Sequence, residues 1–220
     1  MDEAALRKAM VDASVRLDAL GLNRGTSGNL SVRCGSGLLV TPSGVPVEEL
    51  TVSSIVCLTL GGEVVGQGRP SSEWRFHRDI LVARADVHAI IHTHSPFATT
   101  LACLHISVPS FHYMVAAAGG KDIRCAPYAL FGTQELSNHA LVAMRDRKAC
   151  LLANHGMIAT GFDLPAALAL TVEVESLCEQ YWRVRQLGEP RLLSDEQMDR
   201  VMEKFKAYGR QPPAAAHGDL

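Results

Sequence analysis

HAIIHTHSPF, residues 88–97, is an apolar run followed by two histidines with a single residue between them. Because the side chains of an extended strand alternate between the two faces of a sheet, His92 and His94 point the same way at the end of this strand. Pro96 suits the first turn of a helix, which we expect to run to about Leu104. The segment therefore predicts a strand, two convergent imidazoles and a helix in immediate succession.

A third histidine lies in LLANHGMIATG, residues 151–161. His155 follows the apolar run 149–153, and it completes a three-histidine site if the two strands are neighbours in one sheet. Three protein ligands leave a fourth position for water or substrate, as in catalytic zinc sites. The competing interpretation is that these are ordinary core or surface histidines, since the chain has nine and HxH alone is a moderate signal.

The composition predicts one folded domain over residues 1–208 and a disordered tail over 209–220. A chain of 220 residues that is 47% hydrophobic can bury one substantial core. The tail, GRQPPAAAHGDL, is rich in proline and alanine, which is typical of an unstructured terminus.

The charge balance argues against nucleic-acid and membrane partners. The 21 Lys and Arg against 23 Asp and Glu give a net charge of −2, and the basic residues form no stripe beyond 145–148. The six cysteines are widely spaced with no CxxC, which indicates reduced thiols. With no targeting segment and no apolar stretch of membrane-spanning length, we expect a cytoplasmic protein.

Apolar spacing and turn residues predict a mixture of helices and strands, alternating too irregularly for a doubly wound nucleotide-binding sheet. Helical spacing and caps predict helices over 6–20, 73–84, 96–104, 133–145, 163–187 and 194–208. Short apolar runs predict strands over 30–33, 38–41, 55–60, 89–92, 106–108, 123–125 and within 149–159, with His155 at a turn.

Three clusters of Gly, Ser and Thr are candidate phosphate-binding turns: 26–29, 41–44 and 69–73. Their short polar side chains accompany exposed backbone N–H groups, and the last cluster adds a helix N-terminus, for which Ser72 is the expected N-cap. Each cluster by itself is more often a plain turn. Since the chain lacks a GxxxxGKS loop, the three together favour a small phosphorylated metabolite over a nucleotide.

Glu73 is the candidate proton carrier, because it directly follows the third of these turns. A carboxylate there reaches a metal-bound substrate if the turn and the histidines face one cleft. The alternative is an ordinary first-turn glutamate that stabilises the helix dipole. Tyr113 and Tyr208 are weaker candidates for donating a proton to a developing alkoxide, since most tyrosines lie in the core or at its rim.

Segments along nearly the whole chain resemble the class II aldolase/adducin family, most closely its bacterial L-fuculose-1-phosphate aldolases. They are GLNRGTSGNLSVR, LVTPSGVPVEEL, PSSEWRFH, HTHS, FHYMVAAAGG, CAPYALFGTQELS, NHGMIATG and EKFKAYG. The resemblance implies an α/β protein with the three-layer αβα class II aldolase fold and a central, mainly antiparallel sheet. It also implies a C4 homotetramer whose active sites lie between subunits.

The resemblance further implies roles for individual residues. A zinc ion, one per chain and replaceable by Mn²⁺ or Co²⁺, is bound by His92, His94 and His155, with Glu73 as acid/base catalyst and as fourth ligand in the absence of substrate. Tyr113 is the proton donor supplied across a subunit boundary, and Tyr208 closes over the site. The substrate phosphate is held by Thr26, Asn29, Ser43, Gly44, Ser71 and Ser72.

The implied reaction is cleavage of a ketose 1-phosphate to dihydroxyacetone phosphate and a short aldehyde. L-Fuculose, 5-deoxyribulose and 5-methylthioribulose 1-phosphates are all candidate substrates, the last two in salvage of by-products of S-adenosylmethionine use. Rival interpretations are a pentulose-phosphate 4-epimerase or methylthioribulose-phosphate dehydratase of the same superfamily, and a non-catalytic module like the adducin head. FHYMVAAAGG and CAPYALFGT favour the aldolase branch, and the intact histidines and Glu73 argue against the module.

Three positions depart from the fuculose-phosphate pattern. Thr93 and Ser95 stand where Asn and Ala are expected, and Asn154 stands where Gln or His is expected. Because all three flank the metal-binding histidines, we expect them near the aldehyde end of the substrate.

Overall fold

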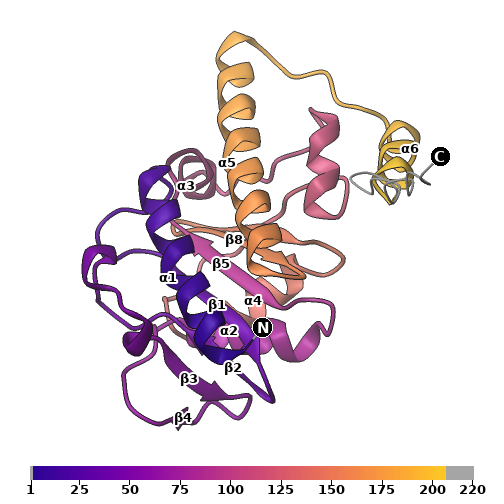
Figure 1. Cartoon of the computed structure of the whole chain (residues 1–220). Coiled ribbons are helices and arrows are strands. Elements are labelled where there is room, and N and C mark those ends of the chain that lie inside the picture. Colours follow the sequence, from indigo (N-terminus) through magenta and orange to yellow (C-terminus); the bar gives the residue numbers. More distant parts are fainter. Residues whose placement is uncertain (1, 207–220) are drawn as a thin grey trace, which may run out of the picture.

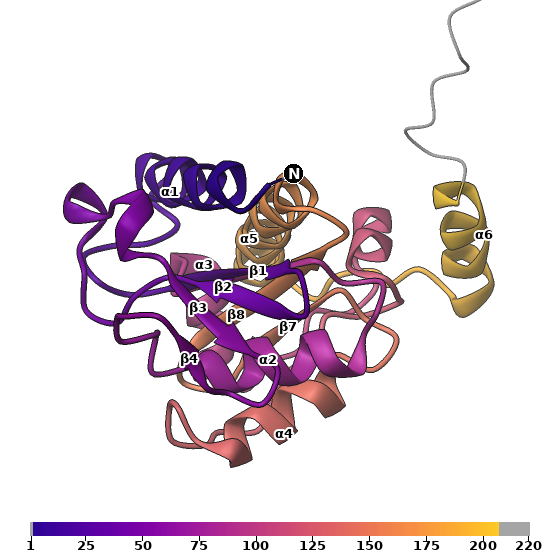
Figure 2. The same ribbon diagram turned by 60° about the horizontal axis from the view of Figure 1, so that its bottom comes forward.

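The computed structural model describes residues 2–206, in which helices cover both faces of one sheet (Figure 1). Figure 2 shows α1 (Glu3–Ala19) and α5 (Leu164–Leu187) on one face and α2 (Trp74–Ala83) and α4 (Gln134–Ala143) on the other. The helix α3 (Pro96–Cys103) packs against α5. The predicted three-layer αβα architecture is confirmed. Tyr208 and the predicted tail over 209–220 lie outside the described residues.

Eight strands of the described residues form one sheet in the order β4-β3-β2-β1-β5-β8-β7-β6. Every neighbouring pair is antiparallel except β6 with β7, which confirms the mainly antiparallel sheet. The strands are β1 (Asn29–Cys34), β2 (Gly37–Val40), β3 (Val56–Thr59), β4 (Val64–Val65), β5 (Ala89–Thr93), β6 (Cys125–Ala126), β7 (Ala149–Leu152) and β8 (Gly156–Gly161).

The structure differs from the expected elements where a turn interrupts an apolar run. The stretch 149–159 is a hairpin, because Asn154 adopts a φ of 54° between β7 and β8. The expected strands 106–108 and 123–125 are reduced to a single bridge, between Val108 and Ile123, and the two-residue β6. Short 3₁₀ helices, which the apolar pattern does not reveal, are η1 (Val47–Glu49), η2 (Val52–Ser54) and η3 (Tyr113–Ala118).

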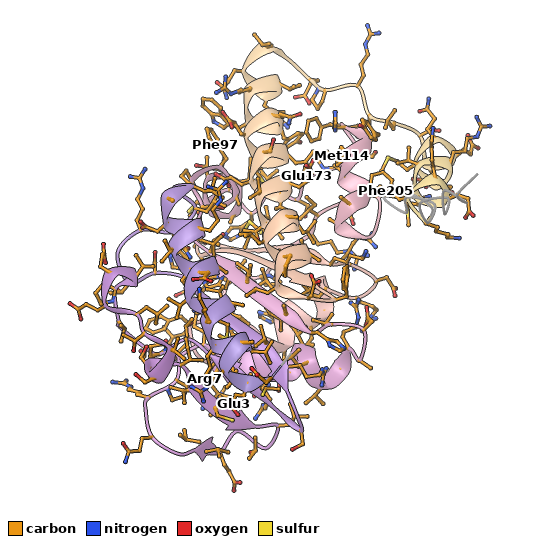
Figure 3. All side chains as sticks on the ribbon, viewed as in Figure 1. Glu3, Arg7, Phe97, Met114, Glu173 and Phe205 are labelled. Atoms are coloured by element: carbon orange, nitrogen blue, oxygen red, sulfur yellow. The ribbon has the colours of Figure 1, made fainter. Side chains whose placement is uncertain are left out.

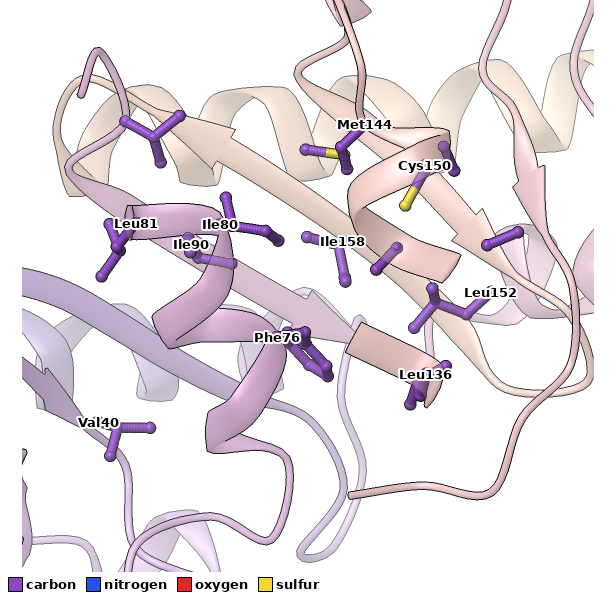
Figure 4. Packing of buried hydrophobic residues seen from close by; sticks show 14 of the residues in the cluster. Val40, Phe76, Ile80, Leu81, Ile90, Leu136, Met144, Cys150, Leu152 and Ile158 are labelled. Atoms are coloured by element: carbon purple, nitrogen blue, oxygen red, sulfur yellow. The ribbon is translucent and has the colours of Figure 1, made fainter. Parts of the chain in front are cut away.

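The alternation of side chains along the strands fills a separate core on each face of the sheet. Under α2 and α4, Phe76 and Ile80 pack with Ile90 and Ile158 (Figure 4). Full burial of side chains of this kind is worth about 1.5–3 kcal/mol each. Residues of the opposite parity, such as Ile91, contribute to the core beneath α1 and α5.

This parity decides which face of the sheet carries the histidine pair. Ile90 faces α2, so His92, two residues later in the same strand, lies on that face also, and its ring meets the ring of Phe76 edge-on. Asn29 and Ser31 of β1 share the face, since both hydrogen-bond to His77 of α2. The first turns of α2 therefore pack over the end of β5.

The last helix, α6 (Asp195–Phe205), stands away from the sheet and packs on η3. Met114 of η3 and Phe205 of α6 lie on the facing sides of these two helices (Figure 3). The helix α6 begins with the predicted capping box, in which Ser194 and Gln197 exchange hydrogen bonds with each other's backbone. Among residues 2–206, no helix combines the length and apolar composition that crossing a membrane requires.

Candidate active site

Four side chains from distant parts of the chain converge beneath α2. His92, His94 and His155 each present an imidazole nitrogen and Glu73 presents its carboxylate, and these atoms all lie within 4.8 Å of one another. The three ring centroids are 4.8 to 4.9 Å apart, with interplanar angles near 75°. The arrangement is a nearly symmetrical ring of three donors closed by a carboxylate.

His92 is oriented by the strand next to its own. Its Nδ1 lies 2.9 Å from the backbone oxygen of Met157 in β8, to which it donates a hydrogen bond. In the neutral imidazole, that bond puts the lone pair on Nε2, which lies 3.0 Å from Nε2 of His94. A ligand histidine anchored through its other nitrogen is the usual arrangement in metal sites.

His155 reaches the other two histidines because β8 lies between β5 and β7 and pairs with both. We expected the strand before His155 to lie directly beside the strand that carries His92. Instead β7 is separated from β5 by β8, and the β7–β8 hairpin brings His155 back to the other two histidines. Gly156 permits the close approach, since a Cβ there would lie 2.3 Å from the backbone oxygen of Thr93 and 3.1 Å from the His94 ring. The turn is further held by the Asn154 N–H, which donates to Ala102 O at 3.1 Å.

Glu73 is not the first-turn glutamate of the alternative interpretation. It is the N-cap residue itself, one position later than the expected cap Ser72, and its side chain makes no capping bond. The carboxylate turns instead toward the sheet, where Oε2 lies 3.2 Å from His92 Nε2 and Oε1 lies 3.2 Å from His155 Nε2. The Asn29 amide nitrogen donates to Oε2 at 3.0 Å.

The charges in this cluster are strongly coupled. Burial opposes ionisation of Glu73, but the positive charge of His92 and its hydrogen bond outweigh burial and hold the pKa of Glu73 well below its usual range. Burial and the charge of His92 lower the pKa of His94 and of His155 to about 4. At neutral pH the pair therefore offers two neutral imidazoles beside an ionised carboxylate.

This donor set fits a divalent cation. Three imidazole nitrogens and a carboxylate are ligands that zinc accepts, and their number matches a tetrahedral site. Buried Glu73 Oε1 has no hydrogen-bond partner among the described residues, so this carboxylate oxygen faces the cluster with its acceptor capacity unused. Four lone-pair donors crowded together favour a positive ion at their centre.

A cavity of about 320 Å³ opens beside the cluster and is lined by Glu73, His94 and His155. The candidate phosphate-binding residues also line it: Thr26, Asn29, Ser43, Gly44, Ser71 and Ser72. Two of the three turns are joined, because the Ser43 N–H donates to Arg69 O at 3.0 Å and the Ser71 N–H donates to Thr41 O at 2.9 Å. The fold thus brings separate turns of β1, β2 and α2 to one hollow.

The tyrosines are placed differently. Tyr113 lies on η3, is half exposed, and does not line this cavity. Tyr208 lies outside the described residues. Lys121 does not line this cavity, and its Nζ pairs with Asp199 of α6 at 2.8 Å.

Two aromatic residues at the cavity mouth are missing from the residues predicted for the site. Tyr128 and Phe131 line it although 57% and 61% exposed respectively. Their loop is held against α2 by Arg75, which donates to Gly132 O at 2.7 Å. Large apolar side chains in CAPYALFGT, a loop bounded by Pro and Gly, are the sequence feature that could have indicated them.

The family model for the class II aldolase and adducin N-terminal domain matches residues 8–182. The chain belongs to this family. Both the ring of histidines and the three turns fall within the matched range.

Characterised relatives extend the similarity to almost the full chain. A 5-methylthioribulose-1-phosphate/5-deoxyribulose-1-phosphate aldolase of Rhodospirillum rubrum is 60% identical over 205 residues, covering 93% of each chain. An L-fuculose phosphate aldolase of Escherichia coli is 46% identical over 210 residues, covering 95% of this chain and 98% of the relative. Among solved structures, an L-fuculose 1-phosphate aldolase superposes with a TM-score of 0.89 at 42% identity, covering 92% of this chain and 96% of that one.

Proposed function

We propose that this protein is a metal-dependent aldolase that cleaves a ketose 1-phosphate to dihydroxyacetone phosphate and a short aldehyde. The observation that carries the proposal is that a carboxylate and three imidazole nitrogens within 4.8 Å of one another border the cavity formed by the three polar turns. The aldolase names of the relatives at 60% and 46% identity support it.

The metal is zinc, with Mn²⁺ or Co²⁺ as substitutes, held by His92, His94 and His155 and by Glu73 when no substrate is present. A divalent ion there supplies Lewis-acid polarisation of the substrate carbonyl, which favours an enediolate when the carbon–carbon bond breaks. The protein provides the fixed imidazole orientation, since His92 is fully buried and anchored to Met157.

Glu73 moves the proton. Its carboxylate is ionised and buried, and Oε1 has no hydrogen-bond partner among the described residues. In synthesis the ionised carboxylate removes a proton from the substrate carbon. In cleavage the proton that leaves the substrate hydroxyl, as that carbon becomes the aldehyde, reaches the carboxylate, which passes it to the enediolate carbon. The lowered pKa of Glu73 keeps this carboxylate ionised at neutral pH.

The phosphate is bound by neutral donors. The cavity-lining residues include no lysine or arginine within the described chain, so hydroxyls, the Asn29 amide and backbone N–H groups hold the anion. Binding energy from this remote group places the reacting carbons beside Glu73 and the histidines.

The complete site includes a second copy of the chain. We assign Tyr113 to the site of a neighbouring subunit of a C4 homotetramer, where its hydroxyl takes part in proton transfer at the departing aldehyde oxygen. We assign Tyr208 to closure over the site. Tyr113 is half exposed and does not line the cavity of its own chain, which supports a role across a boundary.

The substrate is a small phosphorylated ketose of the cytoplasm: L-fuculose, 5-deoxyribulose or 5-methylthioribulose 1-phosphate. The mouth formed by Tyr128 and Phe131 suits an apolar deoxy or methylthio tail. A pocket of this kind discriminates one methylene by only about 1–3 kcal/mol, so we expect cleavage of more than one of the three. A free ketose lacks the phosphate and is cleaved far more slowly.

The test is to incubate the purified protein with each ketose 1-phosphate and with free fuculose, and to measure dihydroxyacetone phosphate, with and without a chelator. Metal-dependent release from the phosphates supports the proposal. Equal rates with and without the phosphate would overturn the assignment of the three turns. Formation of an epimer or a dehydrated product in place of an aldehyde would assign the site to the superfamily's epimerases or dehydratases.

A further inference from the structure

One buried titratable side chain near the site has no part in the chemistry described above. His77 of α2 is fully buried, and its imidazole lies between two polar side chains of β1. Its Nδ1 is 2.7 Å from Ser31 Oγ, and its Nε2 is within hydrogen-bonding distance of Asn29 Oδ1. Asn29 in turn bonds to Glu73.

The hydrogen bond between Asn29 and Glu73 determines the direction of the other two. Ionised Glu73 can only accept, so the Asn29 amide must present its nitrogen to Oε2 and its oxygen to His77. Asn29 Oδ1 accepts, so His77 Nε2 carries the proton and Nδ1 is bare. Ser31 Oγ–H therefore donates to Nδ1. In this series of hydrogen bonds, from Ser31 through His77 and Asn29, every donor points toward the Glu73 carboxylate.

The surroundings of His77 favour the neutral form of its imidazole. It is fully buried, and burial together with the charge of His92 lowers the pKa of His77 to about 3. A neutral imidazole has one donor and one acceptor nitrogen. Both are used, one by each neighbour.

The amide of Asn29 thereby serves the cavity as well as Glu73. An amide nitrogen has two hydrogens, and one is engaged by Glu73 Oε2. Asn29 lines the cavity beside the polar turns, so the second hydrogen is available to an anion there. If the amide turned over, its oxygen would face both the carboxylate and the cavity, which repels two negative groups.

We propose that His77, held by Ser31, is a positioning residue that fixes the Asn29 amide with its nitrogen toward two anions, the Glu73 carboxylate and a phosphate in the cavity. The phosphate half of this inference rests on the proposed function. The Glu73 half rests on the hydrogen bonds alone.

The test compares two substitutions of similar size. His77→Leu removes the donor, while His77→Gln retains an N–H for Asn29 and an oxygen for Ser31. Calorimetry on the zinc-loaded proteins measures binding of inorganic phosphate and of dihydroxyacetone phosphate. We expect His77→Leu to weaken binding of both by about 10-fold to 100-fold, with metal content unchanged, since bonds to charged groups are the strong ones. His77→Gln should recover most of the loss.

A double substitution separates positioning from packing. In the Asn29→Ala background, His77→Leu should change phosphate binding by less than about 2-fold, because the group it positions is absent. Equal loss in His77→Leu and His77→Gln, or an undiminished effect in that background, would overturn the inference. So would wild-type binding in a folded His77→Leu protein.

A measurement on the wild-type protein does not depend on any variant folding. ¹⁵N NMR of the imidazole should show His77 neutral with its proton on Nε2, and a proton on Nδ1 would refute the assignment. Ser31→Ala should shift this tautomer signature. If the protein cleaves no ketose phosphate but shows this tautomer and the phosphate dependence, the inference stands and the proposed function fails.

Discussion

The Ser95 hydroxyl donates a hydrogen bond to the Glu175 carboxylate at 2.7 Å, and both side chains are buried. Glu175, on α5, also accepts from the backbone N–H groups of Phe97 and Ala98 at 2.8 and 2.9 Å. A carboxylate from one helix thus satisfies the free donors at the start of another. The helix in question, α3, directly follows the histidine pair.

This contact corrects the expectation that Thr93 and Ser95 lie near the aldehyde end. Both are fully buried and neither lines the cavity, because they alternate with His92 and His94 and face the α5 side of the sheet. Asn154 does line the cavity. Of the three departures, it alone is positioned to affect the substrate.

Replacing Glu175 by glutamine should lower the free energy of unfolding by about 1.5–3 kcal/mol, because an amide cannot accept all three bonds. Urea unfolding measures this change. Glu179→Gln on the same helix is the control, since its ion pair with Arg183 lies at the surface and is worth less than about 0.5 kcal/mol. Equal losses in both variants would contradict the buried cap.

His155→Ala should remove most of the bound metal, because a three-histidine site loses most of its affinity with one ligand. Metal analysis of the protein after gel filtration measures the content per chain. His88→Ala, which alters an exposed histidine just before β5, should retain full metal. Full content in the His155→Ala protein would show that the third ligand is wrongly assigned.

Glu73→Gln should lower turnover by about 100-fold to 10,000-fold, since the isosteric amide cannot accept a proton. Steady-state assays measure the rate, and circular dichroism checks the fold. Glu63→Gln, in the exposed turn between β3 and β4, serves as the matched control. Normal turnover combined with weaker metal binding would make Glu73 a ligand and not the catalyst.

Gly28→Ala should raise KM much more than Gly25→Ala. Both glycines have positive φ, 76° and 62°, so the backbone strain is shared. Only a Cβ on Gly28 meets a neighbour, the Asn23 side chain at 2.3 Å, and Asn23 Oδ1 accepts from the His94 N–H at 3.4 Å. Similar KM values for the two variants would show that the polar turn tolerates this displacement.

The metal-free protein should lose stability on acidification through His77. Burial and the charge of His92 lower the pKa of His77 from its ordinary 6.5 to about 3. Below pH 6.5 the unfolded chain therefore binds a proton that the folded chain does not, so this stability is complete above pH 6.5 and declines as pH falls toward 3. The limiting slope is about 1.4 kcal/mol per pH unit.

Urea unfolding of the wild type and of His77→Gln between pH 6.5 and 5 isolates this contribution, because glutamine does not titrate and the other groups are common to both proteins. As pH falls, the free energy of unfolding of the wild type should decrease more than that of His77→Gln. Parallel curves would mean that His77 is protonated in the folded state.

Much of the fold and of the candidate site follows from local sequence. The alternation in HAIIHTHSPF, the proline at the start of α3 and the capping box of α6 depend on neighbours within a few residues, and the structure reproduces each of them. The same holds for the three turns, whose Gly, Ser and Thr residues favour turn conformations locally. The grouping of histidines, Glu73 and turns was available only through resemblance to a family, because spacing along the chain does not state distance in space.

Tertiary structure decided which of these groups meet and which way they face. β8 lies between β5 and β7, so His155 returns to the histidine pair through a hairpin and not through a neighbouring strand. Glu73 accepts a hydrogen bond from Asn29, 44 residues away, and Asn29 hydrogen-bonds to His77, 48 residues away. Strand order and buried hydrogen bonds are chosen by which faces can be desolvated together, a property of the packed chain that no short segment contains.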